Sequence, residues 1–218
     1  MSSDVNPRRT YDASNRQEQA RRTRQAVLDA ARERFLHDGY ARTTVAAIAA
    51  DAGVSVETVY KSFGNKPGVV KALFDVAVVG DDEPVPMLQR EFVARNIAEP
   101  DARRKLAAYG EHLAEVAPRA NPIQLVVRDA AASDKAAAAV WRQLGAERLG
   151  GMTAFATHLH EGGHLRAGIT MEDARDVLWT MISVEVWDLL VNERGWPVER
   201  YGTWVGEQLI AALLPPDG

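Results

Sequence analysis

Residues 44–63 read TVAAIAADAGVSVETVYKSF. Threonine and serine are favoured helix N-caps, so Thr44, or its neighbour Thr43, and Ser55 each predict the start of a short helix. Gly53 between the two segments supplies the positive φ of a tight turn. Small residues let two crossing helices approach closely, and this stretch contains Ala46, Ala47, Ala49, Ala50 and Ala52. The pattern therefore predicts a helix-turn-helix, held to a preceding helix by Ile48, Val54, Val59 and Phe63.

The second of these helices is expected to expose a face suited to a DNA groove. Hydroxyl groups donate to phosphate oxygens, an apolar side chain contacts the thymine methyl group, and a carboxylate accepts from the cytosine amine. A lysine reaches guanine or phosphate. The residues on this face are Ser55, Val56, Glu57, Thr58, Tyr60 and Lys61. Lys66, in the first turn of the next helix, opposes the helix dipole unless an anion binds there, and a DNA phosphate is the natural anion.

Helices are also predicted on both sides of the motif. Ser14 and Gln17 form a capping-box pattern before a helix over residues 19–37, and Gly39 is placed to end that helix. Residues 1–13 are polar and are expected to form a flexible arm. Asn65 is expected to cap a fourth helix that reaches Val79. Residues 14–80 are thus predicted to form one helical DNA-binding domain.

The charge distribution agrees with a polyanion binding near the N-terminus. The 218 residues have a net charge of −4. Residues 1–72 contain twelve Lys or Arg and eight Asp or Glu, a net charge of +4, so residues 73–218 carry −8. A basic first third followed by an acidic remainder suggests that only the first third meets nucleic acid.

The remainder of the chain is predicted to be helical, without period-two alternation that would indicate a sheet. Residues 81–86 contain two prolines and are expected to link the first domain to a second one, residues 87–218. Thr170 and Asp173 predict a capping box, and Gly195 and Pro197 separate the last two helices. Helical patterns cover residues 87–98, 101–116, 121–132, 135–160, 171–193 and 198–214, with a break at residues 117–119. The predicted fold class is all-α.

Residues 43–72, TTVAAIAADAGVSVETVYKSFGNKPGVVKA, resemble the DNA-binding domain of the tetracycline-repressor-like (TetR) family of bacterial regulators. The likeness lies in the T-x-x-x-I-A-x-x-A-G-V-S core, the T-x-Y-x-x-F stretch and the N-K that opens the fourth helix. It implies a three-helix DNA-binding head, an acidic all-α effector domain, homodimerisation and control of transcription, usually repression. By motif it covers about residues 18–79. Ser62 departs from the family, which often has histidine there, and puts one phosphate contact in doubt.

The resemblance also implies roles for individual residues. Phosphate contacts are expected from Thr43, Thr44, Ser55, Thr58, Tyr60 and Lys66. Base contacts are expected from Val45, Val56, Glu57 and Lys61. A two-fold dimer would place its two recognition helices about 34–36 Å apart, in successive major grooves of a palindromic operator.

In the second domain, the resemblance implies a small-molecule effector site and a dimer interface. Aromatic and methionine residues at helical spacing are the candidates for the effector site, although such residues also form ordinary helical cores. They are Tyr109, His112, Trp141, Met152, Phe155, Trp179, Met181 and Trp187. The last two helices resemble the pair that dimerises. Their candidate interface residues are Trp204, Val205, Leu209, Ala212 and Leu213.

Two other functions remain open from the sequence. Residues 160–164, HEGGH, match the zincin pattern literally, so His160, Glu161 and His164 could serve a helical metallohydrolase. Two glycines inside the motif disfavour the helix it needs, and no metal or cofactor is expected. The other is a helical interaction module that does not bind DNA. The absence of cysteine excludes thiolate chemistry, and the lack of an apolar span or signal-peptide pattern predicts a cytoplasmic protein without membrane contact.

Overall fold

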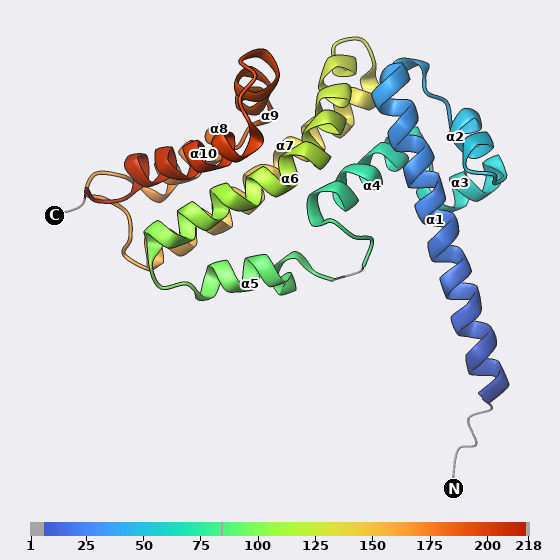
Figure 1. Ribbon diagram of the computed structural model, residues 1–218, viewed down its shortest axis with the longest axis horizontal. Helices are drawn as coiled ribbons and strands as arrows, with labels where there is room; N and C mark the ends of the chain where they lie inside the picture. Colours follow the sequence, from blue (N-terminus) through green and yellow to red (C-terminus); the bar gives the residue numbers. More distant parts are fainter. Residues whose placement is uncertain (1–6, 84, 217–218) are drawn as a thin grey trace, which may run out of the picture. The chain divides into compact units, whose positions relative to one another are not determined.

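The computed structural model describes residues 7–83 and 85–216 and is all-α, with no strand within those ranges (Figure 1). By their internal contacts the residues form two compact units, 1–74 and 75–218. None of the described helices is both long enough and apolar enough to cross a membrane. The predicted all-α fold class is confirmed. The role of residues 81–86 as a linker stays a prediction, as do the proposed domain bounds.

The first unit begins with helix α1 (Pro7–Arg42), which starts earlier than the sequence pattern predicts. Residues 7–13 of the expected arm are helical, while residues 1–6 lie outside the described part of the chain. Proline is well suited to the first helical position, because its missing N–H would have no partner there. Gly39 has a φ of 78° inside the assigned range, so the regular helix ends where the sequence predicts.

The helix-turn-helix consists of α2 (Val45–Asp51) and α3 (Val56–Phe63), and its predicted caps are confirmed. The Ala47 N–H donates to Thr44 Oγ1 at 3.1 Å, and the Thr58 N–H donates to Ser55 Oγ at 3.2 Å. Gly53 adopts a φ of 67° in the turn. These local hydrogen bonds fix where both helices begin, and hence which face of α3 points outward.

The core of the first unit lies between α1 and the two short helices. Its central side chains are fully buried, whereas Val54 and Phe63, also predicted to pack here, are only partly buried. The buried side chains include Val27, Leu28, Ala31, Phe35, Ile48 and Val59. Helix α4 (Lys66–Val79) follows, with the Gly68 N–H donating to Asn65 Oδ1 at 2.8 Å as the predicted cap.

An ion pair joins α1 to the end of α2. Arg34 Nη2 donates to Asp51 Oδ1 at 2.9 Å, and this hydrogen bond, with the positive charge, holds the Asp51 pKa below its ordinary value of 3.8. A carboxyl group with a lowered folded-state pKa stabilises the fold above its unfolded-state pKa, and this stabilisation is lost as the pH falls. Asp51→Asn is therefore expected to lower the melting temperature at pH 7 slightly. The difference from the wild type should shrink toward pH 3 in thermal unfolding, and a difference independent of pH would contradict the pairing.

The second unit contains the longer helices. Helix α6 (Ala102–Ala131) packs against α7 (Lys135–Glu161) and α10 (Val198–Leu213), and α7 also packs against α8 (Met171–Met181) (Figure 1). The shorter elements are the 3₁₀ turn η1 (Met87–Gln89), α5 (Glu91–Ala98), α9 (Val184–Trp187) and the π-helix η2 (Asp188–Glu193). The predicted capping box at Thr170 and Asp173 is present.

Two predicted boundaries in this unit are wrong. The expected break at residues 117–119 does not occur, because α6 continues through Pro118 and Pro122. Both prolines remove a helical hydrogen bond, but Val116, Ala117, Ala120 and Ile123 are buried on the same stretch and packing outweighs that loss. Conversely, the single helix expected over residues 171–193 is interrupted after Met181. The Ser183 hydroxyl accepts from the Val186 N–H at 3.4 Å and starts α9.

Helices α6 and α10 touch backbone to backbone, through three glycines. A Cβ atom added at Gly202 would lie 2.5 Å from the Gly110 carbonyl oxygen and 2.8 Å from the Ala114 Cβ. A Cβ added at Gly110 would meet the Gly202 carbonyl oxygen and lie 2.9 Å from the Gly206 nitrogen. The two helices can approach this closely only because these positions carry no side chain. This contact sets the distance between the two helices at the centre of the unit.

Candidate nucleic-acid interface and effector region

Helix α3 exposes one polar face and buries the opposite one. Val59 is 1% exposed and anchors the helix, while Tyr60 is 50% exposed and Lys61 and Glu57 are also exposed. The hydroxyls of Ser55 and Thr58 lie 3.0 Å apart and are hydrogen bonded to each other. The face therefore presents hydroxyls, a phenol, a carboxylate and an amine on a rigid element, which is the donor and acceptor set that a duplex edge requires.

The carboxyl group of Glu57 is ionised at neutral pH. Its own backbone N–H and the Ser55 hydroxyl donate to it, and these hydrogen bonds lower the Glu57 pKa. An ionised carboxylate at the start of α3 accepts hydrogen bonds but repels phosphate. Glu57 therefore suits a base amine deep in a groove better than a position beside the DNA backbone.

Two residues that the sequence places in the interface lie inside the first unit instead. Thr43 is 1% exposed and its Oγ1 donates to the Gly39 carbonyl oxygen at 2.8 Å, so it closes the end of α1. Val45, the first residue of α2, is 9% exposed and therefore buried. Neither side chain is presented to solvent, so the fold does not favour their expected phosphate and base contacts, which stay a prediction. Thr44 is exposed, and its hydroxyl can still donate while it caps α2.

Lys66 has a partner within the protein, which the sequence pattern does not reveal. Its Nζ donates to the Tyr40 carbonyl oxygen at 2.9 Å and lies 4.0 Å from the centre of the Tyr40 ring. A carbonyl group and an aromatic face stabilise an ammonium group at this point. The lysine at the start of α4 is thus explained without a phosphate, although the half-buried side chain remains near the surface.

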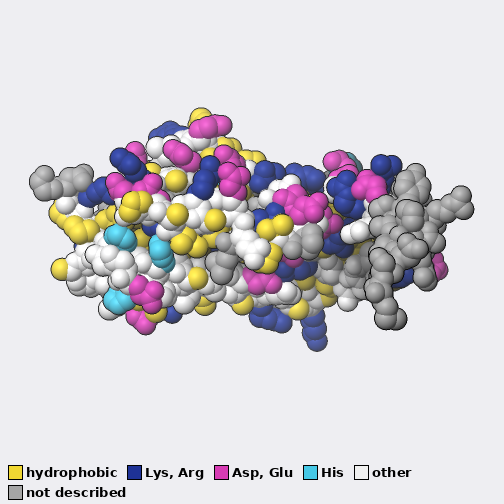
Figure 2. All heavy atoms as spheres, turned by 90° about the horizontal axis from the view of Figure 1, so that it is seen from below, with side chains coloured by type: hydrophobic (Ala, Val, Ile, Leu, Met, Phe, Trp, Pro, Cys, Tyr) yellow, Lys and Arg dark blue, Asp and Glu magenta, His cyan; other side chains and the backbone are white. Residues whose placement is uncertain are grey.

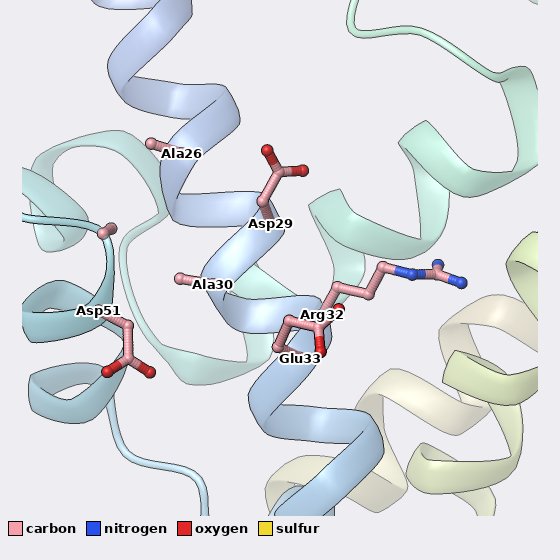
Figure 3. Close-up of a pocket in the computed structure, with 7 residues that line it drawn as sticks. Ala26, Asp29, Ala30, Arg32, Glu33 and Asp51 are labelled. Atoms are coloured by element: carbon pink, nitrogen blue, oxygen red, sulfur yellow. The ribbon is translucent and has the colours of Figure 1, made fainter.

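A shallow depression lies on another side of the first unit, between α1 and the end of α2 (Figure 3). Its charged lining residues are mostly acidic, namely Asp29, Glu33 and Asp51, with Arg32 as the basic member. Carboxylates repel a polyanion, so this depression is not the surface that DNA would contact.

The predicted effector residues of the second unit form part of one aromatic core. Tyr109 and Phe155 pack edge to face, with ring centres 5.1 Å apart, and Tyr109 Oη donates to Met152 Sδ at 3.7 Å. His112 stacks on Phe92, with ring centres 3.7 Å apart. Burial raises the Tyr109 pKa and lowers the His112 pKa, so both groups are neutral at pH 7.

The other predicted effector residues pack in the same core. Trp187 is 5% exposed, and Trp141, Trp179 and Met181 lie partly buried against its members. The structure thus brings the predicted set into one hydrophobic cluster, where each side chain has a packing role. Their contact with an effector stays a prediction.

The sequence prediction misses Arg148, a partly exposed basic residue beside this core. Its guanidinium carbon lies 4.7 Å from the centre of the Trp179 ring. A signal is present in the sequence, because residues seven or four apart share a helix face and Arg148 follows Trp141 by seven and precedes Met152 by four.

The residues of the predicted dimer face differ in exposure. Val205, Leu209 and Leu213 are 0% exposed and pack inside their own protomer, against the neighbouring helices. Their burial in the single chain does not favour contact with a second copy, and their role in a dimer interface stays a prediction. Trp204 and Ala212 are partly exposed and remain candidates. The apolar stripe of α10 is present, but most of it faces the core of the second unit.

The HEGGH segment is not a zincin helix. Helix α7 ends at Glu161, Gly163 has a φ of 68°, and the His164 N–H donates to the Leu159 carbonyl oxygen at 3.0 Å. His164 therefore lies beyond the helix end, and the i, i+4 arrangement of two histidines that zinc would need does not form. Figure 2 shows histidine side chains at the surface among charged and apolar ones. Within the described ranges, no group of three His, Asp or Glu side chains is placed to hold a metal.

Comparison with known proteins places the motif in a family. Residues 27–73 match the family model described as "Bacterial regulatory proteins, tetR family". The chain is 45% identical over 58 residues to the HTH-type transcriptional regulator TtgR of Pseudomonas putida. These 58 residues are 27% of this chain and 28% of that protein. The match thus spans little more than a quarter of this relative's length.

Solved structures resemble the chain over most of its length. NalD of Pseudomonas aeruginosa, described as the secondary repressor of the MexAB-OprM multidrug efflux pump, has a TM-score of 0.68 at 20% identity, covering 92% of this chain and all of that one. FadR of Bacillus subtilis in complex with stearoyl-CoA has a TM-score of 0.66 at 21% identity, covering 86% of this chain and 97% of that one. At these identities the likeness establishes the fold.

Proposed function

We propose that this chain, which belongs to the tetR family of bacterial regulatory proteins, is a transcriptional regulator whose helix α3 enters the major groove of duplex DNA. The observation that carries the proposal is the polarity of α3, with Val59 buried beneath it and Tyr60, Lys61 and Glu57 outward. An exposed tyrosine held on a rigid, doubly capped helix has no packing role. A role in binding accounts for it.

The exposed and partly exposed residues divide by chemistry into backbone and base contacts. Thr44, Ser55, Thr58 and Tyr60 carry hydroxyls and fit phosphate oxygens, which position the protein without reading sequence. Val56, Glu57 and Lys61 fit base edges, where a good contact discriminates by about 1–3 kcal/mol. Sequence preference should therefore follow the second group.

The proposed regulator acts as a homodimer on a palindromic operator. A two-fold pair presents two copies of α3 to successive major grooves, which one copy cannot do. Beside Trp204 and Ala212, the second unit exposes Leu189, at 53%, on the π-helix that precedes α10. An exposed leucine near the end of the first segment of the expected dimer pair, residues 171–193, supports an interface there.

The proposed mode of control is repression that a small molecule relieves. NalD is described as a repressor and FadR is solved with stearoyl-CoA, and both share this fold. Helix α4 contributes residues to both units, so a displacement of α4 on effector binding would reach the DNA-binding unit. A difference of about 1–3 kcal/mol in effector affinity between two states changes DNA affinity roughly 5–150-fold.

Capture of genomic DNA tests this function and identifies the operator in the same experiment. The purified protein, mixed with sheared DNA of its source organism, is expected to enrich a few fragments that share a palindrome with half-sites about 10 base pairs apart. A Tyr60→Ala, Lys61→Ala double variant serves as the control and should enrich none of them. Equal recovery of all fragments by both proteins would refute the proposal.

A further inference from the structure

Arg148, on α7, is partly exposed, but part of its guanidinium group is buried in the second unit. Its Nε and Nη1 atoms are shielded from solvent and have no hydrogen-bond partner among the described residues. No ion pair joins it to an acidic side chain in those residues either. A charged donor left unsatisfied in a protein interior is strongly destabilising, so a stable fold would normally avoid it. The group therefore requires a physical account.

The side chains around Arg148 are mostly aromatic, and none of them accepts a hydrogen bond from its Nε or Nη1. Trp179, whose ring lies against the guanidinium, has its own Nε1–H buried without a partner. Tyr109 donates its phenolic hydrogen to the sulfur of Met152, a weak acceptor. Tyr109 and Tyr201 lie close enough to Arg148 to stabilise its charge if their phenols were ionised. Burial raises the pKa of both phenols, however, so neither is an anion at neutral pH.

One acidic residue lies in the neighbourhood. Glu185, at the start of α9, interacts favourably with the charge of Arg148 but is exposed and makes no hydrogen bond to it. Burial lowers the Arg148 pKa, but an arginine stays protonated at any physiological pH. The second unit thus holds a permanent positive charge whose Nε and Nη1 donors are buried and unpaired, beside the aromatic ring of Trp179.

We propose that the second unit binds an apolar organic anion, with Arg148 donating to its carboxylate or sulfonate group and the aromatic core contacting its apolar body. Arginine presents parallel N–H groups that match the two oxygens of such an anion. This assignment rests on the proposed function, because it specifies the chemistry of the effector. It also accounts for an arginine that the unliganded fold leaves unsatisfied.

A pair of fluorescent probes that differ only in charge tests the inference. One is 8-anilinonaphthalene-1-sulfonate, and the other is N-phenyl-1-naphthylamine, the same molecule without its sulfonate. The wild-type protein is expected to bind the sulfonate more tightly than the amine. Arg148→Met should weaken sulfonate binding at least tenfold and change amine binding less than twofold, because methionine retains the apolar volume. The matched control is Arg142→Met, an exposed position on the same helix, which should change neither.

Thermal unfolding separates a ligand-binding arginine from a structural one. Without probe, Arg148→Met should raise the melting temperature, since it removes an unpaired buried charge, and it should lose the rise that the sulfonate gives the wild type. A fall in melting temperature, or a smaller dimer fraction by light scattering, would show that Arg148 is satisfied by Glu185 or by a second copy. Either result would overturn the inference, and so would equal sulfonate binding by wild type and variant.

Failure of this inference can be told apart from failure of the proposed function. Without an anion, Arg148→Met should bind the captured DNA as the wild type does, because α3 is unaltered. Retained DNA binding with unchanged sulfonate affinity would refute only the anion site. Loss of DNA binding by the wild type itself would refute the regulator proposal.

Discussion

Replacement of Gly202 by alanine is expected to destabilise the second unit by at least about 3 kcal/mol, near the top of the usual range for overpacking. The added Cβ would lie 2.5 Å from the Gly110 carbonyl oxygen and 2.8 Å from the Ala114 Cβ. The first of these contacts is with backbone and cannot be relieved by a rotamer change, so α6 and α10 must separate. Total stability is commonly only about 5–15 kcal/mol, and this loss is a large part of it.

Thermal unfolding followed by circular dichroism would measure the effect, with a fall of roughly 6–12 °C in the melting temperature. Gly145→Ala is the matched control, because a Cβ added at Gly145, inside α7, meets nothing within 4 Å. This control should gain about 0.5–1 kcal/mol from the higher helix propensity of alanine. Equal stability of the two variants would contradict the close contact of α6 with α10.

The second large effect is expected in DNA binding, from Tyr60→Ala. Tyr60 is 50% exposed and makes no contact that the fold needs, so the variant should unfold at the wild-type temperature. Its affinity for operator DNA should fall by about 1–3 kcal/mol, or roughly 5–150-fold. If the phenol contacts phosphate, the loss of affinity should be similar for duplexes of any sequence. Fluorescence anisotropy with a labelled duplex measures this loss.

The control for Tyr60 is Leu36→Ala, which removes another exposed apolar side chain of the same unit, on α1. It should leave DNA affinity unchanged. If both variants, or neither, lost affinity, α3 would not be the element in contact with DNA. Lys66→Ala is a poorer test, because it also removes the hydrogen bond to the Tyr40 carbonyl oxygen and would change stability together with affinity.

The helix-turn-helix can be predicted almost to the residue because its determinants are local. Thr44 and Ser55 each cap a helix through hydrogen bonds within four residues, and Gly53 adopts the predicted turn conformation. The long helices depend on tertiary contacts instead. The two prolines in α6 and Ser183 before α9 all favour a local break in a helix. Packing overrides this tendency in α6 but not at Ser183, so the local sequence does not distinguish the two cases.

The candidate sites are harder to predict, because periodicity identifies an apolar face but not what covers it. The stripe of α10 suggests contact with a partner protomer, yet Val205, Leu209 and Leu213 are covered by helices of the same chain. Thr43 and Val45 likewise match a family pattern of DNA contacts but are buried here. Arg148 escapes prediction because an isolated arginine on a long helix ordinarily faces solvent.

The most direct test of the regulator account is a titration of the wild-type protein with two labelled duplexes at physiological salt. One carries the palindrome recovered from genomic capture and the other carries the same bases in shuffled order. A sequence-reading α3 predicts that the palindrome binds at least about 1,000-fold more tightly. Equal affinity for the two duplexes would contradict the account, since it would mean that the exposed face of α3 does not read bases.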